Sequence, residues 1–325
     1  MDTLKYVLKR LLFLVFVFFI IISVCFLLIR LLPNMPATQF GKDMQLVLNS
    51  RYRQGLVDKY GNEIPLIQQY FNFVTKTLIG GNWGIGENLY RTQDVFSVFL
   101  EKLPNTILVN AYSSLLAVPT GLALGIYAAL KKNKWQDHLI STGVMVLVSV
   151  PSYVYAFLIQ YLLCFKLQIF PLQMEAGRQY FTWDTFWSMM PAVISLSLGS
   201  IAGYARFTRA ELTEVLTSDY LLLARTKGLT RAQTTVRHAL RNAMVPIFPS
   251  ILSEIIAVLG GSLIIESIFG VPGVGDMYVR SINARDYNIF MLLSAFYTLI
   301  GLTAGIVVDL SYGFIDPRIR MGSKK

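Results

Sequence analysis

Charged side chains able to bind a partner or an anion gather in residues 204–246, a polar interval between apolar stretches. Residues 206–241 carry seven Arg or Lys side chains against three acids, Glu211, Glu214 and Asp219. Such a basic cluster is typical either of a nucleic-acid-binding face or of the cytoplasmic loops that orient a membrane protein. The apolar stretches on both sides favour the second interpretation, and we expect no nucleic-acid partner.

Local signals in this interval predict a helix that ends in a glycine turn. Asp219 is placed to cap a short helix over residues 220–227 by accepting a hydrogen bond from a free N–H of the first turn. Arg225 and Lys227 lie in the last turn, where cations suit the helix dipole. Gly228 follows where the chain needs a left-handed stop.

A second helix is predicted directly after the glycine turn. Residues 230–233 read Thr-Arg-Ala-Gln, which matches a capping box. The whole interval is therefore predicted to be a compact, rigid helix–turn–helix lobe rather than a slack linker.

Glu254 is the notable ionisable residue inside an apolar stretch. A charge at that depth costs about 3 kcal/mol on insertion scales, so the carboxyl should face a cavity or a partner. One interpretation is a pore-lining acid that meets a positively charged substrate end. The other is a carboxyl hydrogen-bonded to Ser250, Ser253 or a neighbouring helix.

The sequence patterns of the common hydrolases and nucleotide-binding proteins are absent. No Walker A pattern occurs, and the glycine-rich residues 81–86 lack the Lys-Ser/Thr of a phosphate-binding loop. No His-Glu-x-x-His occurs, and residues 260–263 lack the closing glycine of a serine-nucleophile turn. We therefore expect no enzyme, and no cofactor or metal site, in this chain.

The composition is that of a polytopic helical membrane protein. Of the 325 residues, 54% are hydrophobic and only 15% charged, and the mean hydropathy is +0.53. A soluble domain usually carries about 25% charged residues. The two cysteines lie in apolar stretches, which predicts buried thiols without a disulfide.

Six membrane spans are predicted from the uncharged stretches. The short loops assigned to the cytoplasm are rich in Lys and Arg, as the net charge of +10 reflects, so both termini are expected inside. The first stretch is too long for a signal peptide and lacks a cleavage pattern. The expected spans are residues 11–29, 106–130, 139–165, 189–204, 244–265 and 290–308.

The spans divide the chain into an N-terminal helix (1–33), an extracytoplasmic helical segment (34–104), a five-helix core (105–315) and a cytoplasmic tail (316–325). The core includes the basic lobe, 206–243. The loop between the last two spans is dense in Gly and Pro, which predicts a fixed turn at the outer mouth. It could be a connector, a gate or a docking surface, with its marked residues being Glu266, Phe269, Pro272, Gly273 and Gly275.

Several motifs resemble the oligopeptide/dipeptide permeases of ATP-binding-cassette importers. Residues 224–229 (Ala-Arg-Thr-Lys-Gly-Leu) and 237–243 are similar to the family's cytoplasmic EAA loop, whose glycine matches Gly228. The start of that motif is relaxed here to Leu-Leu-Ala at residues 222–224. The resemblance extends to Pro33, Leu-Pro-Asn-Thr at 103–106, Ser-Val-Pro-Ser at 149–152, the Gly/Pro loop, and Asp-Pro-Arg at 316–318.

This resemblance implies the first of two permease subunits, with a type I importer fold extended by an N-terminal helix and the extracytoplasmic segment. It also implies a sister permease, two ATPases that hold ATP and Mg, an extracytoplasmic binding protein and surrounding membrane lipid, in a bacterial or archaeal cell membrane. The ATPase contact would fall on Asp219, Tyr220, Ala224, Arg225, Lys227, Gly228 and Leu229.

Three alternatives stay open at this point. The chain could be a stand-alone channel or secondary carrier, although it shows no inverted repeat and few intramembrane charges. It could be a membrane scaffold. It could also be the permease of a related importer for nickel chelates or other small solutes.

Overall fold

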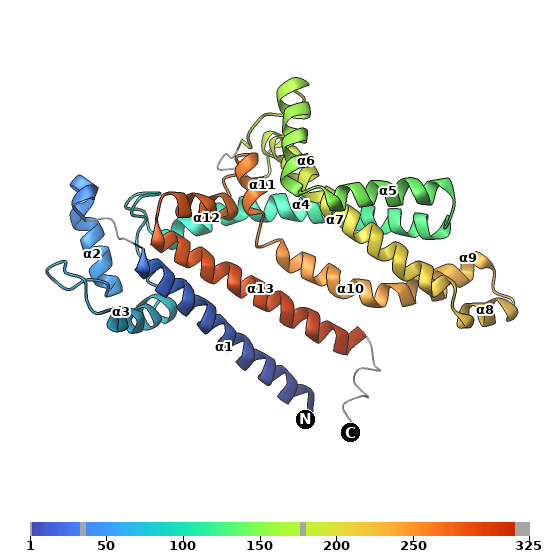
Figure 1. Cartoon of the computed structure of the whole chain (residues 1–325), viewed down its shortest axis with the longest axis horizontal. Helices are drawn as coiled ribbons and strands as arrows, with labels where there is room; N and C mark the ends of the chain where they lie inside the picture. The colour runs from blue at the N-terminus through green and yellow to red at the C-terminus, as the bar shows by residue number, and fades with distance from the viewer. Residues whose placement is uncertain (1, 33–36, 176–179, 316–325) are drawn as a thin grey trace. The chain divides into compact units, whose positions relative to one another are not determined.

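The computed structural model describes residues 2–32, 37–175 and 180–315, which form helices joined by turns, with no β-strand among them (Figure 1). Two parts of the chain pack internally and are described separately. The first unit comprises Met1–Thr106 and Pro272–Leu302, and the second comprises Ile107–Val271 and Thr303–Lys325. The predicted boundaries at residues 33, 104 and 315 follow chain order rather than packing and stay a prediction. Pro33 and the predicted tail, 316–325, lie outside the described residues.

The first unit is built on α1 and the first part of α13. Ile22, Phe26 and Ile29 of α1 are buried against Phe73 and Met291, which fixes α1 beside α13 (Figure 1). The elements of this unit are α1 (Asp2–Leu31), η1 (Ala37–Asp43), α2 (Met44–Gln54), α3 (Leu66–Asn72), the π-helical turn η2 (Phe73–Ile79), α12 (Val274–Asn283), and the first parts of α4 (Val95–Leu130) and α13 (Tyr287–Ile315).

Asp286 ties the segment before α4 to the start of α13 within the first unit. Its carboxylate oxygen Oδ2 accepts the backbone N–H groups of Glu87, Asn88 and Leu89 at 2.8, 2.8 and 3.0 Å. The Asp286 side chain is fully buried. Three consecutive N–H groups of a segment that lies outside the helices are therefore bound by one side chain.

The second unit is a helical core around α7 (Trp183–Leu216). Gly121 and Gly125 of α4 allow its backbone to approach α7 closely, because a Cβ at either position would lie 2.6 Å from the Cβ atoms of Tyr204 or Thr208. The other elements are α5 (Trp135–Ser149), α6 (Ser152–Ile159), the π-helical turn η3 (Gln160–Lys166), α8 (Asp219–Thr226), α9 (Arg231–Thr234), the π-helical turn η4 (Thr235–Ala239), α10 (Leu240–Ala257) and α11 (Leu263–Ile268).

Five described helices are long and apolar enough to cross a membrane, and a bent pair makes a sixth candidate. The multi-span, all-α fold predicted from composition is confirmed. The third span predicted over residues 139–165 corresponds to this bent pair and is not one straight helix, because α5 and α6 meet at a bend of 101°. Val150 has an extended backbone there, as expected for a residue that precedes a proline.

The fifth predicted span, 244–265, also needs correction. The helical run that covers its first part is Arg231–Ala257, and the separate short helix α11 begins only at Leu263. Gly260 and Gly261 occupy the break, and Gly261 has a left-handed φ of 66°. A helix does not continue through such a residue. The sequence stays apolar beyond the end of the helix, and the predicted span was therefore too long.

Candidate coupling lobe and translocation pocket

The predicted helix–turn–helix lobe is present and joins the ends of α7 and α10 (Figure 1). Its first helix begins one residue earlier than predicted. Ser218 is the N-cap residue and Asp219 is the first helical residue, so the predicted capping role of Asp219 is wrong. The Asp219 carboxylate instead lies in the first turn, where it still suits the positive end of the helix dipole.

The glycine turn is confirmed. Gly228 has a φ of +89°, and its N–H donates to the carbonyl oxygen of Arg225 at 3.0 Å. The N–H of Leu229 donates to the carbonyl oxygen of Ala224 at 3.4 Å. No atom lies within 4 Å of the place that a Cβ of residue 228 would occupy. Glycine is therefore required here by the backbone angle and not by space.

The capping box that opens the second helix is also confirmed. The backbone N–H of Gln233 donates to the Thr230 hydroxyl oxygen at 3.3 Å, and the backbone N–H of Thr230 donates to the Gln233 side chain at 3.0 Å. The two bonds satisfy two free donors at once and fix the angle at which α9 leaves the turn.

The lobe is fixed to the helices beneath it by one buried face. Leu221 of α8 packs with Leu212 of α7 and with Ala239 and Ala243 on the way into α10. The Asn242 side-chain amide donates to the Tyr220 hydroxyl at 2.9 Å. A displacement of α8 must therefore displace the ends of α7 and α10, because close-packed side chains have no room to yield.

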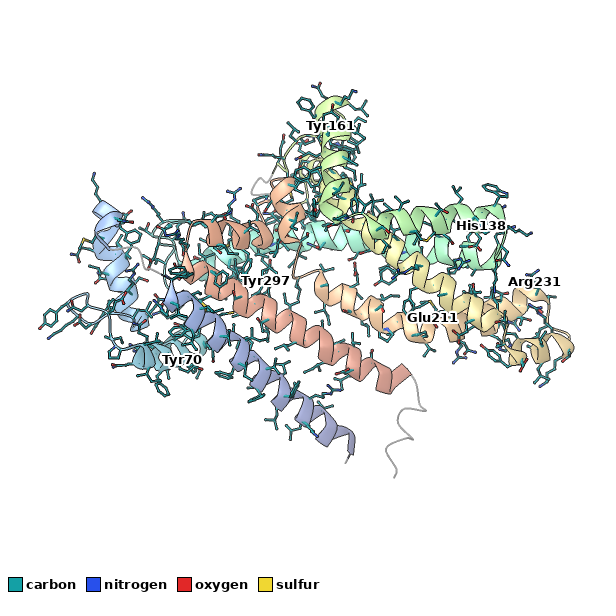
Figure 2. All side chains as sticks on the ribbon, viewed as in Figure 1. Tyr70, His138, Tyr161, Glu211, Arg231 and Tyr297 are labelled. Atoms are coloured by element: carbon teal, nitrogen blue, oxygen red, sulfur yellow. The ribbon has the colours of Figure 1, made fainter. Side chains whose placement is uncertain are left out.

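The opposite face of α8 presents apolar side chains to its surroundings. Leu222 and Leu223 remain 56% and 57% exposed, and Tyr220 remains 42% exposed. Arg225 and Lys227 are exposed beside them, and Arg231 marks the start of the second helix (Figure 2). Exposed leucines flanked by cations on a rigid helix are typical of a surface that contacts another protein.

Glu254 lies in a pocket of the second unit. Its Oε1 accepts hydrogen bonds from the hydroxyls of Ser200 at 3.1 Å and Ser114 at 3.4 Å. The hydrogen bonds come from serines of two neighbouring helices, α7 and α4, as one of the two interpretations of Glu254 expected, and not from Ser250 or Ser253. The pocket has a volume of about 470 Å³ and is lined by Ser200, Gly203, Tyr204, Arg206, Phe207, Ala210, Ser250 and Glu254.

Arg206 is a pocket residue that the sequence patterns did not single out. It is exposed and lies on the same wall of α7 as Tyr204, whose hydroxyl donates to the Ser250 carbonyl oxygen at 3.1 Å. No ion pair with Glu254 or another described acid is present at Arg206. The pocket therefore offers one acidic and one basic group, both available to a solute.

The predicted gate residues fall in both units. Glu266 and Phe269 belong to the second unit and are 0% and 2% exposed. The Phe269 carbonyl oxygen accepts the N–H of Met174 at 3.0 Å, which holds the turn against the chain before α7. Pro272 and Gly273 lead into α12 in the first unit, and Gly275 lies in the first turn of that helix. Since the side chains of Glu266 and Phe269 are not displayed, a gate or docking role for this loop stays a prediction.

The sequence profile of the family described as "binding-protein-dependent transport system inner membrane component" matches residues 121–321, well over half of the chain. The chain belongs to this family. The match contains the coupling lobe, the pocket residues of α7 and α10, and the predicted outer loop. The family assignment is therefore correct, although the start of the lobe motif departs from the family pattern.

Curated relatives extend the likeness over nearly the whole permease. The dipeptide transport system permease protein DppB of Bacillus subtilis is 32% identical over 321 residues, which cover 98% of this chain and 99% of the relative. The oligopeptide transport system permease protein OppB of Salmonella typhimurium is 31% identical over 317 residues, again 98% and 99% of the two chains. Both alignments include the N-terminal helix and the segment after it.

A solved structure shares the fold. A chain of the methionine ABC transporter MetNI in an inward-facing conformation matches with a TM-score of 0.50 at 17% identity. The match covers 66% of this permease and 97% of that chain. The importer-permease fold expected from the resemblance is thus confirmed, and about a third of this chain is additional to it.

Proposed function

We propose that this permease carries peptides, as the first of two permease subunits of an ATP-driven importer. The names of its dipeptide and oligopeptide relatives support the substrate class. Helix α8, with one face buried and the other exposed, supports the proposal that separate ATPase subunits drive transport. The sequence has no nucleotide-binding motif of its own, yet it presents a rigid apolar helix face at the ends of two spans.

The remaining subunits follow from this arrangement. A sister permease would complete the path, two ATPases holding ATP and Mg would bind the lobe, and a binding protein would deliver the peptide from outside. The lobe and both termini would then be cytoplasmic, and residues 34–104 would lie outside the cell membrane of a bacterium or archaeon. The basic loops near the lobe support this orientation.

Force would reach the pocket through α7 and α10. ATP-driven closure of the ATPases would move α8 as a rigid body, since its buried face and the capping box of α9 that follows the turn resist bending. The same two helices carry Ser200, Arg206 and Glu254, so their tilt would open or close the pocket around a peptide.

Affinity purification tests the assembly directly. The tagged permease, extracted in mild detergent from cells that express its neighbouring genes, is expected to retain a sister permease and two ATPases. Replacing both Leu222 and Leu223 with alanine should release the ATPases and leave the sister permease bound. Peptide uptake by the purified chain alone, driven by an ion gradient, would instead establish a secondary carrier.

Gly228→Val is expected to uncouple ATP hydrolysis from uptake. A β-branched residue at a left-handed φ carries about 1–2 kcal/mol of strain, which the turn can relieve by reorienting α8. Membrane insertion should be normal, because a Cβ at this position meets no neighbour. Gly228→Asn is the matched control, since asparagine tolerates the left-handed conformation and should retain coupling. Normal uptake per ATP hydrolysed in the valine variant would contradict a coupling role for this turn.

Glu254→Gln is expected to slow the transport of peptides with a free amino terminus. The amide can keep accepting from Ser200 and Ser114 but cannot attract an ammonium group. Uptake rates of a free and an N-acetylated tripeptide in proteoliposomes measure the effect, which should fall severalfold for the free peptide only. Glu211→Gln, a charge change on α7 outside the pocket lining (Figure 2), serves as the control. Equal losses for both peptides would show that Glu254 has only a structural role.

A further inference from the structure

An apolar groove runs along the first unit between α1 and the α12–α13 connection. Its volume is about 370 Å³, and its lining includes Leu28 of α1, Leu32 directly after α1 and Ile282 of α12, each about half exposed. Ile29, Tyr287 and Phe290 also line it. No described part of the unit covers the exposed side chains of Leu28, Leu32 and Ile282.

The groove lies at the end of two membrane spans. The candidate spans α1 and α13 reach Leu31 and begin at Tyr287 respectively, and both of these ends border the groove. The groove wall formed by α1 therefore runs from acyl-chain depth to the membrane surface, whichever leaflet this is. Lipid headgroups occupy that level of the bilayer.

The lining of this groove includes one cation. Arg285 is exposed and lines the groove, and no carboxylate among the described residues pairs with it. The neighbouring Arg280 is occupied by Asp276 at 2.7 Å. The carboxylate of Asp286 is buried and holds backbone N–H groups.

The backbone holds Arg285 in a fixed and strained position. Its φ is +54°, in the left-handed region that arginine rarely adopts. Its N–H donates to the carbonyl oxygen of Ile282 at 3.1 Å, and its own carbonyl oxygen accepts the side-chain amide of Asn88 at 3.3 Å. Strain of this kind persists where the surrounding structure enforces it and often marks a functional position.

We propose that this groove binds an anionic phospholipid, with one acyl chain along Leu28, Leu32 and Ile282 and the phosphate on the Arg285 guanidinium. Guanidinium groups bind phosphate through paired hydrogen bonds, and an unpaired cation at headgroup depth favours an anionic lipid. A helix of a partner subunit would fill the apolar walls but would leave the cation unused. The site is independent of the solute that the permease carries.

Photocrosslinking in the assembled transporter tests the proposal. The complex is reconstituted in nanodiscs with phosphatidylglycerol or phosphatidylcholine that carries a diazirine in one acyl chain, and labelled peptides are mapped by mass spectrometry. Phosphatidylglycerol is expected to label residues 28–32 and 282. Arg285→Asn, which tolerates the left-handed backbone, should reduce that labelling about fivefold. Arg285→Lys should retain most of it.

Two further variants separate the site from general effects. Ile282→Trp should fill the groove and abolish labelling by either lipid. Arg53→Asn removes an exposed cation of α2 that does not line the groove and should change nothing. Equal labelling by the two lipids, unchanged labelling of Arg285→Asn, or crosslinks from residues 28–32 to a partner subunit in place of lipid would overturn the proposal.

Discussion

Asp286→Ala is expected to destabilise the first unit by on the order of 3 kcal/mol, because the N–H groups of three consecutive part-buried residues lose the buried carboxylate that accepts them. Glu87, Asn88 and Leu89 lie outside the helices, so no helical carbonyl oxygen replaces the lost carboxylate as acceptor for their N–H groups. The segment before α4 should then detach from α13. We expect a lower Tm of the purified assembly and faster proteolysis within residues 86–94.

Asp286→Asn is the matched control for this change. All three N–H groups meet a single carboxylate oxygen, Oδ2, and an amide oxygen can stand in its place. Burial raises the pKa of Asp286 despite the lowering effect of the N–H donors, so the negative charge itself is disfavoured there. The asparagine variant should therefore retain most of the stability. An alanine variant as stable as the wild type would show that water satisfies these donors.

Arg209→Ala is the second change with a large expected effect. The Arg209 guanidinium spans from α7 to Asp137 of α5, with its Nη2 donating to Oδ2 at 2.8 Å. The Asp137 side chain is only 1% exposed, whereas Arg209 is 33% exposed. Removing the arginine leaves a buried carboxylate without its counter-charge, which costs on the order of 3 kcal/mol. The measurement is the Tm of the purified assembly.

A double variant distinguishes the ion pair from simple loss of packing. Asp137→Leu combined with Arg209→Met removes both charges and keeps apolar volume, so it should recover most of the stability that Arg209→Ala loses. Arg231→Ala removes an exposed cation of the lobe (Figure 2) and should change the Tm little. If the double variant were less stable than Arg209→Ala, the pair would be stabilising beyond the burial of its charges.

Local signals in the sequence were sufficient to predict the lobe. Gly228 and the pair Thr230–Gln233 act through hydrogen bonds that span at most five positions, so their residue types alone carry the information. The capping role of Asp219 was wrong by one position. Ser218 and Asp219 are adjacent and both are good cap residues, and only the backbone angles distinguish them.

Apolar length predicted the spans less well than it predicted the class of protein. The proline at 151 was visible in the sequence, but its bend of 101° depends on what α5 and α6 each pack against. The predicted end of the fifth span was wrong for a similar reason. Ile265 is apolar because it is buried in a core with Met189 and Phe269, within the separate helix α11, and not because the span continues to it.

The sequence by itself determined the membrane class, the rigid lobe and the family, because composition and short-range capping do not depend on how the chain folds back. Only the tertiary structure decided which polar groups meet. Hydrogen bonds join Glu254 to Ser114, Arg209 to Asp137, and Asp286 to Glu87. The partners are 140, 72 and 199 positions apart in the sequence. Each pairing is made by the tertiary fold, and no periodicity in the chain encodes a contact over such separations.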